Sequence, residues 1–195
     1  GAFDLSYLRL VPNLTILAPS NGEDLKKMLE WSIGEAKPIA IRYPRGCAAD
    51  LPQLTDTDEI QMGKGRIISL GKEINIAAIG SMVSVAIEVA DKLRKIGIDC
   101  GVADLRFAKP LDRELVKTLL KSSSKLISLE ENTIVGGVGA GIADIIREEQ
   151  ITDVKLEVMG IPDCFVEHGG RGQLMKDIRL DVDGVFEKAR EMVKG

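Results

Sequence analysis

The chain has 195 residues, of which 45% are hydrophobic, 29% are charged and only 4% are aromatic. It carries 26 Lys and Arg against 30 Asp and Glu, for a formal net charge of -4. This balance argues against a nucleic-acid-binding protein, because such proteins present a basic surface. No stretch approaches the roughly 20 consecutive apolar residues of a membrane span, and we expect no signal peptide.

The three cysteines, Cys47, Cys100 and Cys164, are widely spaced. An odd number at this spacing favours reduced thiols over a disulfide framework or a CxxC metal site, so we expect a cytoplasmic protein. The chain starts at Gly1 without a methionine and enters patterned sequence at once. We therefore expect it to be a piece of a longer protein.

The first 46 residues predict a βαβ unit. Residues 4–9 favour one short helical turn, and residues 14–17 and 39–43 favour strands. Between the strands, Ser20 and Glu23 fit an S-x-x-E capping box that begins a helix with an apolar stripe. Strand, helix and strand within about 30 residues is typical of parallel pairing. Because two strands cannot bury both of their faces, we interpret residues 1–46 as the end of a larger sheet.

Residues 47–62 are polar and lack a sustained period, so we interpret them as an interdomain linker. Residues 63–195 then alternate between strand and helix patterns, which predicts a doubly wound, mostly parallel α/β domain. The half-apolar residues 154–158 predict an edge strand, and Asp112 is placed to cap a helix. The expected strands are 66–70, 74–79, 98–105, 126–129 and 154–158, and the expected helices have apolar residues within 82–93, 115–120, 142–146 and 182–193.

A turn with two arginines follows the strand at 39–43, in the order Arg42-Tyr43-Pro44-Arg45-Gly46. Pro44 ends the strand because it lacks an N–H donor, and Gly46 lets the backbone turn away. Ligands of open α/β sheets bind beyond the carboxyl ends of the strands, where Arg45 should lie. A planar guanidinium there suits a phosphate or a carboxylate, although a surface arginine or one paired with a carboxylate fits the spacing as well.

Two further features have competing interpretations. The glycine-rich loop Gly136–Gly141 lies between a strand and a helix, but Ile142 stands where the G-x-G-x-x-G pattern needs a glycine. Close packing of helix and strand is favoured over anion binding. His168 is the only histidine, and with no partner nucleophile or second histidine it is better explained as a structural or surface residue than as an acid–base group.

Charged residues elsewhere predict structural roles. Glu130 and Glu131 are adjacent at a strand end, so their side chains should point to opposite faces, with one of them binding loop N–H groups. Arg171, Lys176 and Arg179 are interpreted as ordinary solvated charges.

Several blocks together resemble the 1-deoxy-D-xylulose-5-phosphate synthases, which are transketolase-type thiamine diphosphate enzymes. These blocks occur in the order of that family and cover nearly the whole chain. They are Ala2-Phe3-Asp4-Leu5-Ser6-Tyr7-Leu8-Arg9, Pro19-Ser20, Arg42-Tyr43-Pro44-Arg45-Gly46, Met62-Gly63-Lys64-Gly65, the run from Asp104 to Asp112, and Glu130-Glu131-Asn132 with the glycine-rich loop behind it.

The resemblance implies the end of a pyrimidine-binding domain at residues 1–46 and a transketolase C-terminal domain at residues 63–195. It implies an enzyme that joins pyruvate to glyceraldehyde 3-phosphate with release of CO2, serving isoprenoid, thiamine and pyridoxal synthesis, and acting as a homodimer. It assigns the substrate phosphate to Arg45, with Arg42 as a weaker candidate that supports the loop.

The family's cofactors are thiamine diphosphate and Mg²⁺, but the family's His-Gln pair, cofactor-contacting glutamate and Gly-Asp-Gly motif have no counterpart in this chain. We therefore expect no catalytic, cofactor-binding or metal-binding residue here, and a chain that alone is inactive. The C-terminal part of a transketolase or of a 2-oxo-acid dehydrogenase β chain, and a purely structural dimerisation module, remain as alternatives.

Overall fold

The computed structural model describes residues 2–44, 46–47, 51, 54, 59–166 and 169–195. Its elements, in chain order, are α1 (Asp4–Arg9), β1 (Thr15–Leu17), α2 (Gly22–Ile33), β2 (Ile39–Ile41), β3 (Arg66–Ser69), β4 (Ile74–Ala78), α3 (Met82–Lys95), β5 (Cys100–Asp104), β6 (Phe107–Lys109), α4 (Arg113–Ser122), β7 (Lys125–Thr133), α5 (Val138–Glu148), β8 (Lys155–Ile161), α6 (Arg171–Asp177) and α7 (Val182–Lys194).

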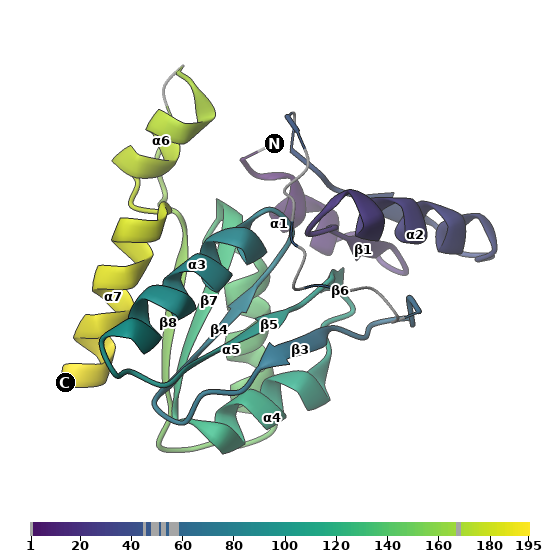
Figure 1. Cartoon of the computed structure of the whole chain (residues 1–195). Helices are drawn as coiled ribbons and strands as arrows, with labels where there is room; N and C mark the ends of the chain where they lie inside the picture. The colour runs from purple at the N-terminus through teal and green to yellow at the C-terminus, as the bar shows by residue number, and fades with distance from the viewer. Residues whose placement is uncertain (1, 45, 48–50, 52–53, 55–58, 167–168) are drawn as a thin grey trace.

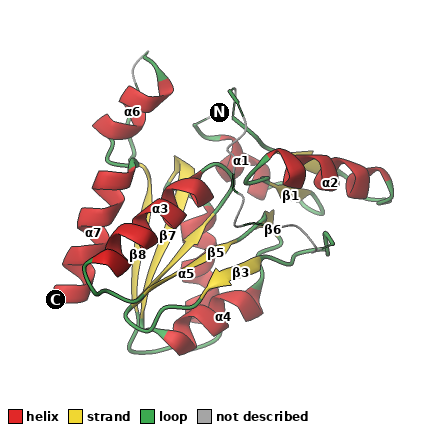
Figure 2. Ribbon diagram, in the orientation of Figure 1, coloured by secondary structure: helices red, strands yellow, loops and turns green. Residues whose placement is uncertain are grey.

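A five-stranded sheet in the order β3-β5-β4-β7-β8 forms the centre of the molecule (Figure 1). β5, β4, β7 and β8 pair in parallel, and β3 pairs antiparallel to β5. Helices α3 and α7 cover one face, and α4 and α5 cover the other (Figure 2). The doubly wound α/β arrangement predicted for residues 63–195 is therefore confirmed, and β8 is the edge strand that its alternating pattern predicted.

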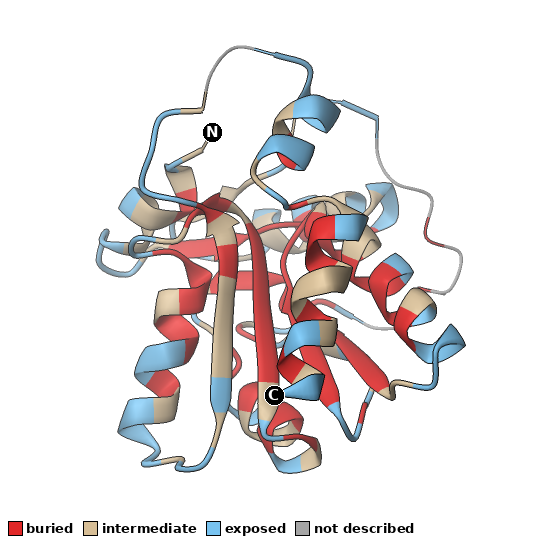
Figure 3. Cartoon of the chain, turned by 90° about the vertical axis from the view of Figure 1, so that its left-hand side faces the viewer, coloured by how far each residue is buried: buried red, intermediate tan, exposed pale blue. Residues whose placement is uncertain are grey.

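Two apolar cores lie on the two faces of this sheet, and the central strands between them are buried (Figure 3). β4 and β5 are buried along their whole length, because helices cover both faces of the sheet. Burial on both faces is typical of parallel strands in α/β proteins. Cys100 lies in this core, whereas Cys47 and Cys164 are exposed, and all three are free thiols. No helix in the described ranges has the length and apolarity needed to cross a membrane.

A smaller sheet in the order β2-β1-β6 lies beside the carboxyl ends of the central strands (Figure 1). β1 and β2 are parallel and joined by α2, so the predicted βαβ unit is confirmed. β6 was not predicted; it pairs antiparallel with β1. Its fully buried Phe107 packs edge-on against Trp31 of α2, with ring centroids 5.9 Å apart.

Helix α2 begins one residue later than the capping box requires. Asn21 is the N-cap, and its side chain accepts a hydrogen bond from the backbone N–H of Asp24 at 2.8 Å. The predicted Ser20 cap is wrong because the Ser20 hydroxyl donates to the Asp24 carboxylate instead. At the start of α4, by contrast, Asp112 caps the helix as predicted, accepting from the N–H of Leu115.

A cluster of buried ion pairs connects α2 to the large sheet. The Asp24 carboxylate is fully buried and lies 2.8 Å from Arg66 of β3 and 3.0 Å from Arg106. Arg66 also pairs with Asp104 at the end of β5, at 3.0 Å. Burial raises the pKa of Asp104, and the nearby charge of Arg66 opposes that shift. Four charges buried together thus connect the segment before the polar stretch 47–62 to the segment after it.

Candidate functional site

The central sheet has a topological switch point between β4 and β7. From β4 the chain passes through α3 to β5 on one side, and later through α4 to β7 on the other side. Ligand-binding crevices of open α/β sheets lie at such points, beyond the carboxyl ends of the strands. Ser81, just after β4, and Glu131, near the end of β7, meet here: the Ser81 hydroxyl donates to Glu131 at 2.6 Å.

Arg171, the first residue of α6, completes this contact. Its Nε and Nη2 atoms each donate to one oxygen of Glu131 at 2.7 Å, and Nη2 also donates to the Ser81 hydroxyl at 3.0 Å. A two-pronged pair of this kind fixes the orientation of a guanidinium. The prediction that Arg171 is an ordinary solvated charge is therefore wrong, because β7 presents a carboxylate to it from 40 residues away.

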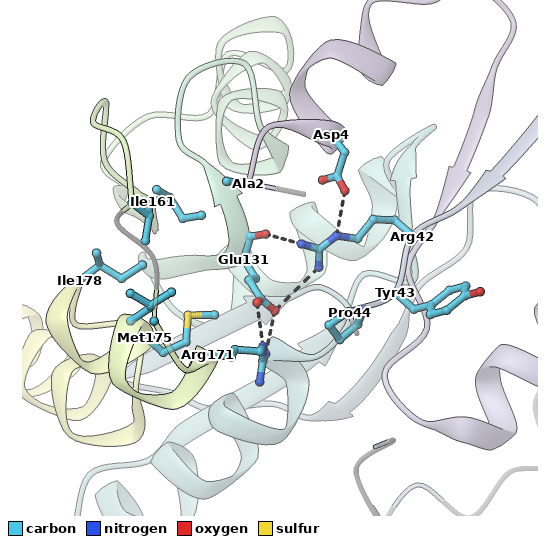
Figure 4. Close-up of a pocket in the computed structure, with 13 residues that line it drawn as sticks. Ala2, Asp4, Arg42, Tyr43, Pro44, Glu131, Ile161, Arg171, Met175 and Ile178 are labelled. Carbon is cyan, nitrogen blue, oxygen red and sulfur yellow. Dashed lines mark hydrogen bonds and ion pairs between the residues drawn. The ribbon is translucent and has the colours of Figure 1, made fainter. Parts of the chain in front are cut away.

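Arg42 approaches Glu131 from the other side (Figure 4). Its guanidinium donates to the backbone carbonyl of Glu131 at 2.8 Å and lies 3.8 Å from the carboxylate. It also contacts Asp4 of α1 at 3.5 Å. Arg42 therefore ties the turn after β2 to β7 and α1.

The pKa of Glu131 reflects these contacts. Burial by itself raises the pKa of this carboxyl, but hydrogen bonds from Arg171 and Ser81 and the charges of Arg171 and Arg42 outweigh burial and hold it below its ordinary value. The same pair raises the pKa of Arg171. Glu131 is thus an anion at neutral pH and serves to position cations rather than to carry protons.

Two cavities flank Arg171. The larger, about 380 Å³, is lined by Asp4, Arg42, Glu131 and apolar residues of β8 and α6 (Figure 4). The smaller, about 180 Å³, lies between the first residues of α2 and α3. Tyr43, Pro44 and Arg171 line both cavities.

The principal predicted site residue, Arg45, lies outside the described residues, as does His168. The sequence neighbours of Arg45 are described: Pro44 and Gly46 both line the smaller cavity. Pro44 and Gly46 therefore border a hollow beside the end of β2, and the assignment of Arg45 to an anion stays a prediction.

Glu130 and Glu131 point to opposite faces, as predicted. Glu130 accepts hydrogen bonds from the backbone N–H groups of Val138 and Gly139 at 2.9 and 2.8 Å, at the start of α5. Burial raises the pKa of this carboxyl, and those two hydrogen bonds partly oppose the shift. The prediction that one of the pair binds loop N–H groups is confirmed.

The glycine-rich loop allows close packing of α5 against β7 and β8. A Cβ on Gly137 would lie 2.4 Å from the Glu130 carboxylate, and one on Gly139 would lie 2.4 Å from Val158 of β8. The loop backbone must therefore approach β7 and β8 more closely than a side chain permits. Close packing of helix and strand, the favoured interpretation of this loop, is confirmed.

Asn132 ties α1 to the large sheet. Its side chain accepts from the N–H of Leu5 at 3.1 Å and donates to the Ser6 hydroxyl at 2.8 Å. Three consecutive residues of β7 thus contact three separate parts of the fold. Glu130 binds the start of α5, Glu131 binds the side chains of Arg42 and Arg171, and Asn132 binds α1.

The described residues do not fit a diphosphate and metal site. None of them forms a group of three or more His, Cys, Asp or Glu side chains that could hold a metal ion. The N–H groups at the start of α5, which could otherwise receive an anion, already bind the Glu130 carboxylate. The described residues therefore offer neither a ligand set for a metal ion nor free N–H groups at the start of α5 for a diphosphate.

Comparison with known families agrees with this fold. A sequence model of the transketolase C-terminal domain matches residues 63–185, and one of the transketolase pyrimidine-binding domain matches residues 1–49. Two solved structures share the fold: a split-gene transketolase described as an inactive beta4 tetramer (TM-score 0.90, 24% identity, covering 98% of this chain and 61% of that one), and the transketolase of Campylobacter jejuni (TM-score 0.70, 21% identity, covering 96% and 27%). The chain belongs to the transketolase C-terminal domain family.

Among individual proteins, it is similar to 1-deoxy-D-xylulose-5-phosphate synthases. It is 40% identical to enzyme 1 of Geobacter sulfurreducens over 185 residues, which are 95% of this chain and 29% of that protein. It is 40% identical to the enzyme of Chlorobium luteolum over 195 residues, which are 100% of this chain and 31% of that protein. The chain thus spans about 30% of the length of these relatives.

Proposed function

We propose that the chain is the C-terminal part of a 1-deoxy-D-xylulose-5-phosphate synthase that condenses pyruvate with glyceraldehyde 3-phosphate and releases CO2. Similarity at 36% to 41% identity along nearly the whole chain carries this proposal. In this proposal residues 1–46 are the end of the pyrimidine-binding domain, residues 47–62 are a linker and residues 63–195 are the C-terminal domain. The complete protein is a homodimer in the cytoplasm. Thiamine diphosphate and Mg²⁺ belong to the remaining length of the protein.

In this proposal Arg45 binds the phosphate of glyceraldehyde 3-phosphate. Its neighbours Pro44 and Gly46 border the smaller cavity, which supports the assignment. Arg42 is the weaker candidate, because its guanidinium already contacts Asp4 and Glu131 and is only 12% exposed. Its role is to hold the turn that carries Arg45.

The β2 edge and one face of α2 support the expectation of a larger sheet. In the described part of the chain β2 has a neighbour, β1, on one side only, and Leu29 and Ile33 of α2 are 48% and 86% exposed. Both residues belong to the apolar stripe of this helix. Strands from the remaining length of the protein would cover them.

The test is an activity assay of this chain completed by the polypeptide that supplies the rest of the relatives' length. CO2 release from pyruvate should require glyceraldehyde 3-phosphate, thiamine diphosphate and Mg²⁺. Arg45→Ala should weaken transition-state binding by about 2–3 kcal/mol, seen mainly in the KM of the phosphorylated substrate.

Other outcomes would favour the alternatives. Two-carbon transfer between sugar phosphates would identify a transketolase, and acyl transfer from pyruvate to a lipoyl group would identify a 2-oxo-acid dehydrogenase. An unchanged KM in Arg45→Ala would favour a structural dimerisation module.

A further inference from the structure

The turn after β2 makes few contacts of its own. The backbone N–H of Arg42 donates to the carbonyl of Leu17 in β1 at 2.8 Å. In the described part of the chain, residues 43–44 and 46–47 make no hydrogen bond beyond this point. Tyr43 is 60% exposed, so its ring contributes little packing. The position of the turn therefore depends largely on the contacts of the Arg42 side chain.

The Arg42 guanidinium connects this turn to the central sheet (Figure 4). Its side chain is 12% exposed; it donates to the backbone carbonyl of Glu131 at 2.8 Å and lies 3.8 Å from the Glu131 carboxylate. It also lies 3.5 Å from the carboxylate of Asp4 in α1. Because little water screens these charges, a guanidinium between two carboxylates has a well-defined position.

Glu131 is itself held in one orientation. Arg171 donates to both of its carboxylate oxygens at 2.7 Å, and the Ser81 hydroxyl donates to one of them at 2.6 Å. These donors come from the start of α6 and from the residue before α3. The Glu131 side chain is 14% exposed. Since rotation of the carboxylate would break these charge-assisted hydrogen bonds, Arg42 faces an anion that is fixed in advance.

Apolar packing against α6 does not replace these contacts. Tyr43 and Pro44 of the turn line one side of the larger cavity, and Met175 and Ile178, in and just after α6, line the opposite side (Figure 4). This cavity has a volume of about 380 Å³. The ion pairs therefore span a hollow that the side chains of the turn and of α6 leave open.

We infer that Glu131 is a positioning residue for the turn after β2 and acts through Arg42. Arg171 and Ser81 act one step further away, because they orient Glu131. The effect on catalysis rests on the proposed function, in which this turn carries Arg45. In that case the transketolase C-terminal domain affects substrate binding without contacting the substrate.

The direct test is a measurement of backbone order parameters by NMR relaxation in the 195-residue chain. Arg42→Met removes every contact of the guanidinium, so the order parameters of Tyr43 and Gly46 should fall toward the range of flexible backbone, below about 0.6. Glu131→Gln should give a smaller fall, because the backbone carbonyl of this residue still accepts from Arg42 but the charge of its side chain is lost.

Glu149→Gln is the matched control for Glu131→Gln. Glu149 also accepts two hydrogen bonds from one arginine, Arg113, but it lines neither cavity beside the turn. Its substitution should leave the order parameters of the turn unchanged. An unchanged turn in Glu131→Gln, or an equal fall in Glu149→Gln, would overturn the inference. So would an equal fall in the central strand β4, which would indicate a general loosening of the fold.

Kinetics of the completed protein then test the effect on catalysis. Glu131→Gln should raise the KM of glyceraldehyde 3-phosphate about 5- to 10-fold and leave the KM of pyruvate unchanged. Arg171→Met should act in the same direction, and Arg171→Lys should act less, because the lysine keeps a positive charge beside Glu131. A fall in kcat with both KM values unchanged would indicate a merely structural role and contradict the inference. If the completed protein lacks synthase activity, the proposed function fails, and the order parameters still decide whether Glu131 positions the turn.

Discussion

Glu130 and Glu131 are adjacent in β7, and their carboxylates lie in opposite electrostatic surroundings. Glu130 is fully buried and faces backbone N–H groups of α5, whereas Glu131 faces the guanidinium groups of Arg171 and Arg42. Burial raises the pKa of Glu130; for Glu131 the cations and Ser81 outweigh burial and lower it. Successive side chains of a strand point to opposite faces, so these two neighbouring glutamates have pKa values that shift in opposite directions.

Glu131→Gln should destabilise the chain at neutral pH by about 1.5–3 kcal/mol, because it weakens charge-assisted hydrogen bonds. The folded-state pKa lies below the ordinary value of 4.5, so the carboxylate's contribution is complete above pH 4.5 and is lost as the pH falls through the lowered value. Urea unfolding at a series of pH values should show that the difference in free energy of unfolding between wild type and variant becomes smaller as the pH falls below 4.5. A gap that stays constant down to the acid limit of folding would contradict this.

Glu130→Gln should show the opposite pH trend. Its pKa in the folded chain lies above 4.5, so the folded state holds the proton more tightly than the unfolded state and wild-type stability falls as the pH rises through that interval. The advantage of wild type over the variant should therefore be greatest at acid pH. The same unfolding series measures it, and a gap that widens toward neutral pH would refute the assignment.

Periodic features of the fold could be predicted from the sequence, because local patterns determine them. The apolar run at Ile74–Ala78 and the stripe within Met82–Lys95 gave the correct elements. β6 could not be predicted, since Phe107–Lys109 is too short to show a period and becomes a strand only where β1 lies beside it. The N-cap of α2 was ambiguous because Ser20 and Asn21 are adjacent and both are good N-cap residues. In the structure the Ser20 hydroxyl donates to the buried Asp24 carboxylate, and Asn21 caps the helix.

The candidate site was less predictable because distant segments form it. Ser81, Glu131 and Arg171 are separated by 50 and 40 residues, and only the parallel sheet brings them together. The Arg42–Gly46 turn could be found because Pro and Gly mark it locally. Arg171 has no such marker; the available signal was its place after the last predicted strand, at the same edge of the sheet as Glu131.

Gly139→Ala should destabilise the chain by about 1–3 kcal/mol through overpacking. The new methyl group would lie 2.4 Å from Val158 Cγ1 and 2.5 Å from Ser128 Oγ. Gly172→Ala is the matched control, because each glycine is the second residue of its helix and nothing lies within 4 Å of a Cβ at Gly172. Thermal or urea unfolding should separate the two variants; equal stabilities would show that α5 can move away from β8.

Asp24→Asn should be the most destabilising of these changes, at about 3–5 kcal/mol, because it leaves two buried guanidinium groups short of a compensating charge. Asp24 is fully buried between Arg66 and Arg106, and these contacts connect α2 to the large sheet. Asp183→Asn is the control, since Asp183 is 80% exposed and its pair with Lys92 lies at the surface; it should leave stability unchanged. Hydrogen exchange should also increase in α2 before the central strands open. If α2 keeps its protection in Asp24→Asn, the apolar contacts of Met28 and Trp31 hold it instead.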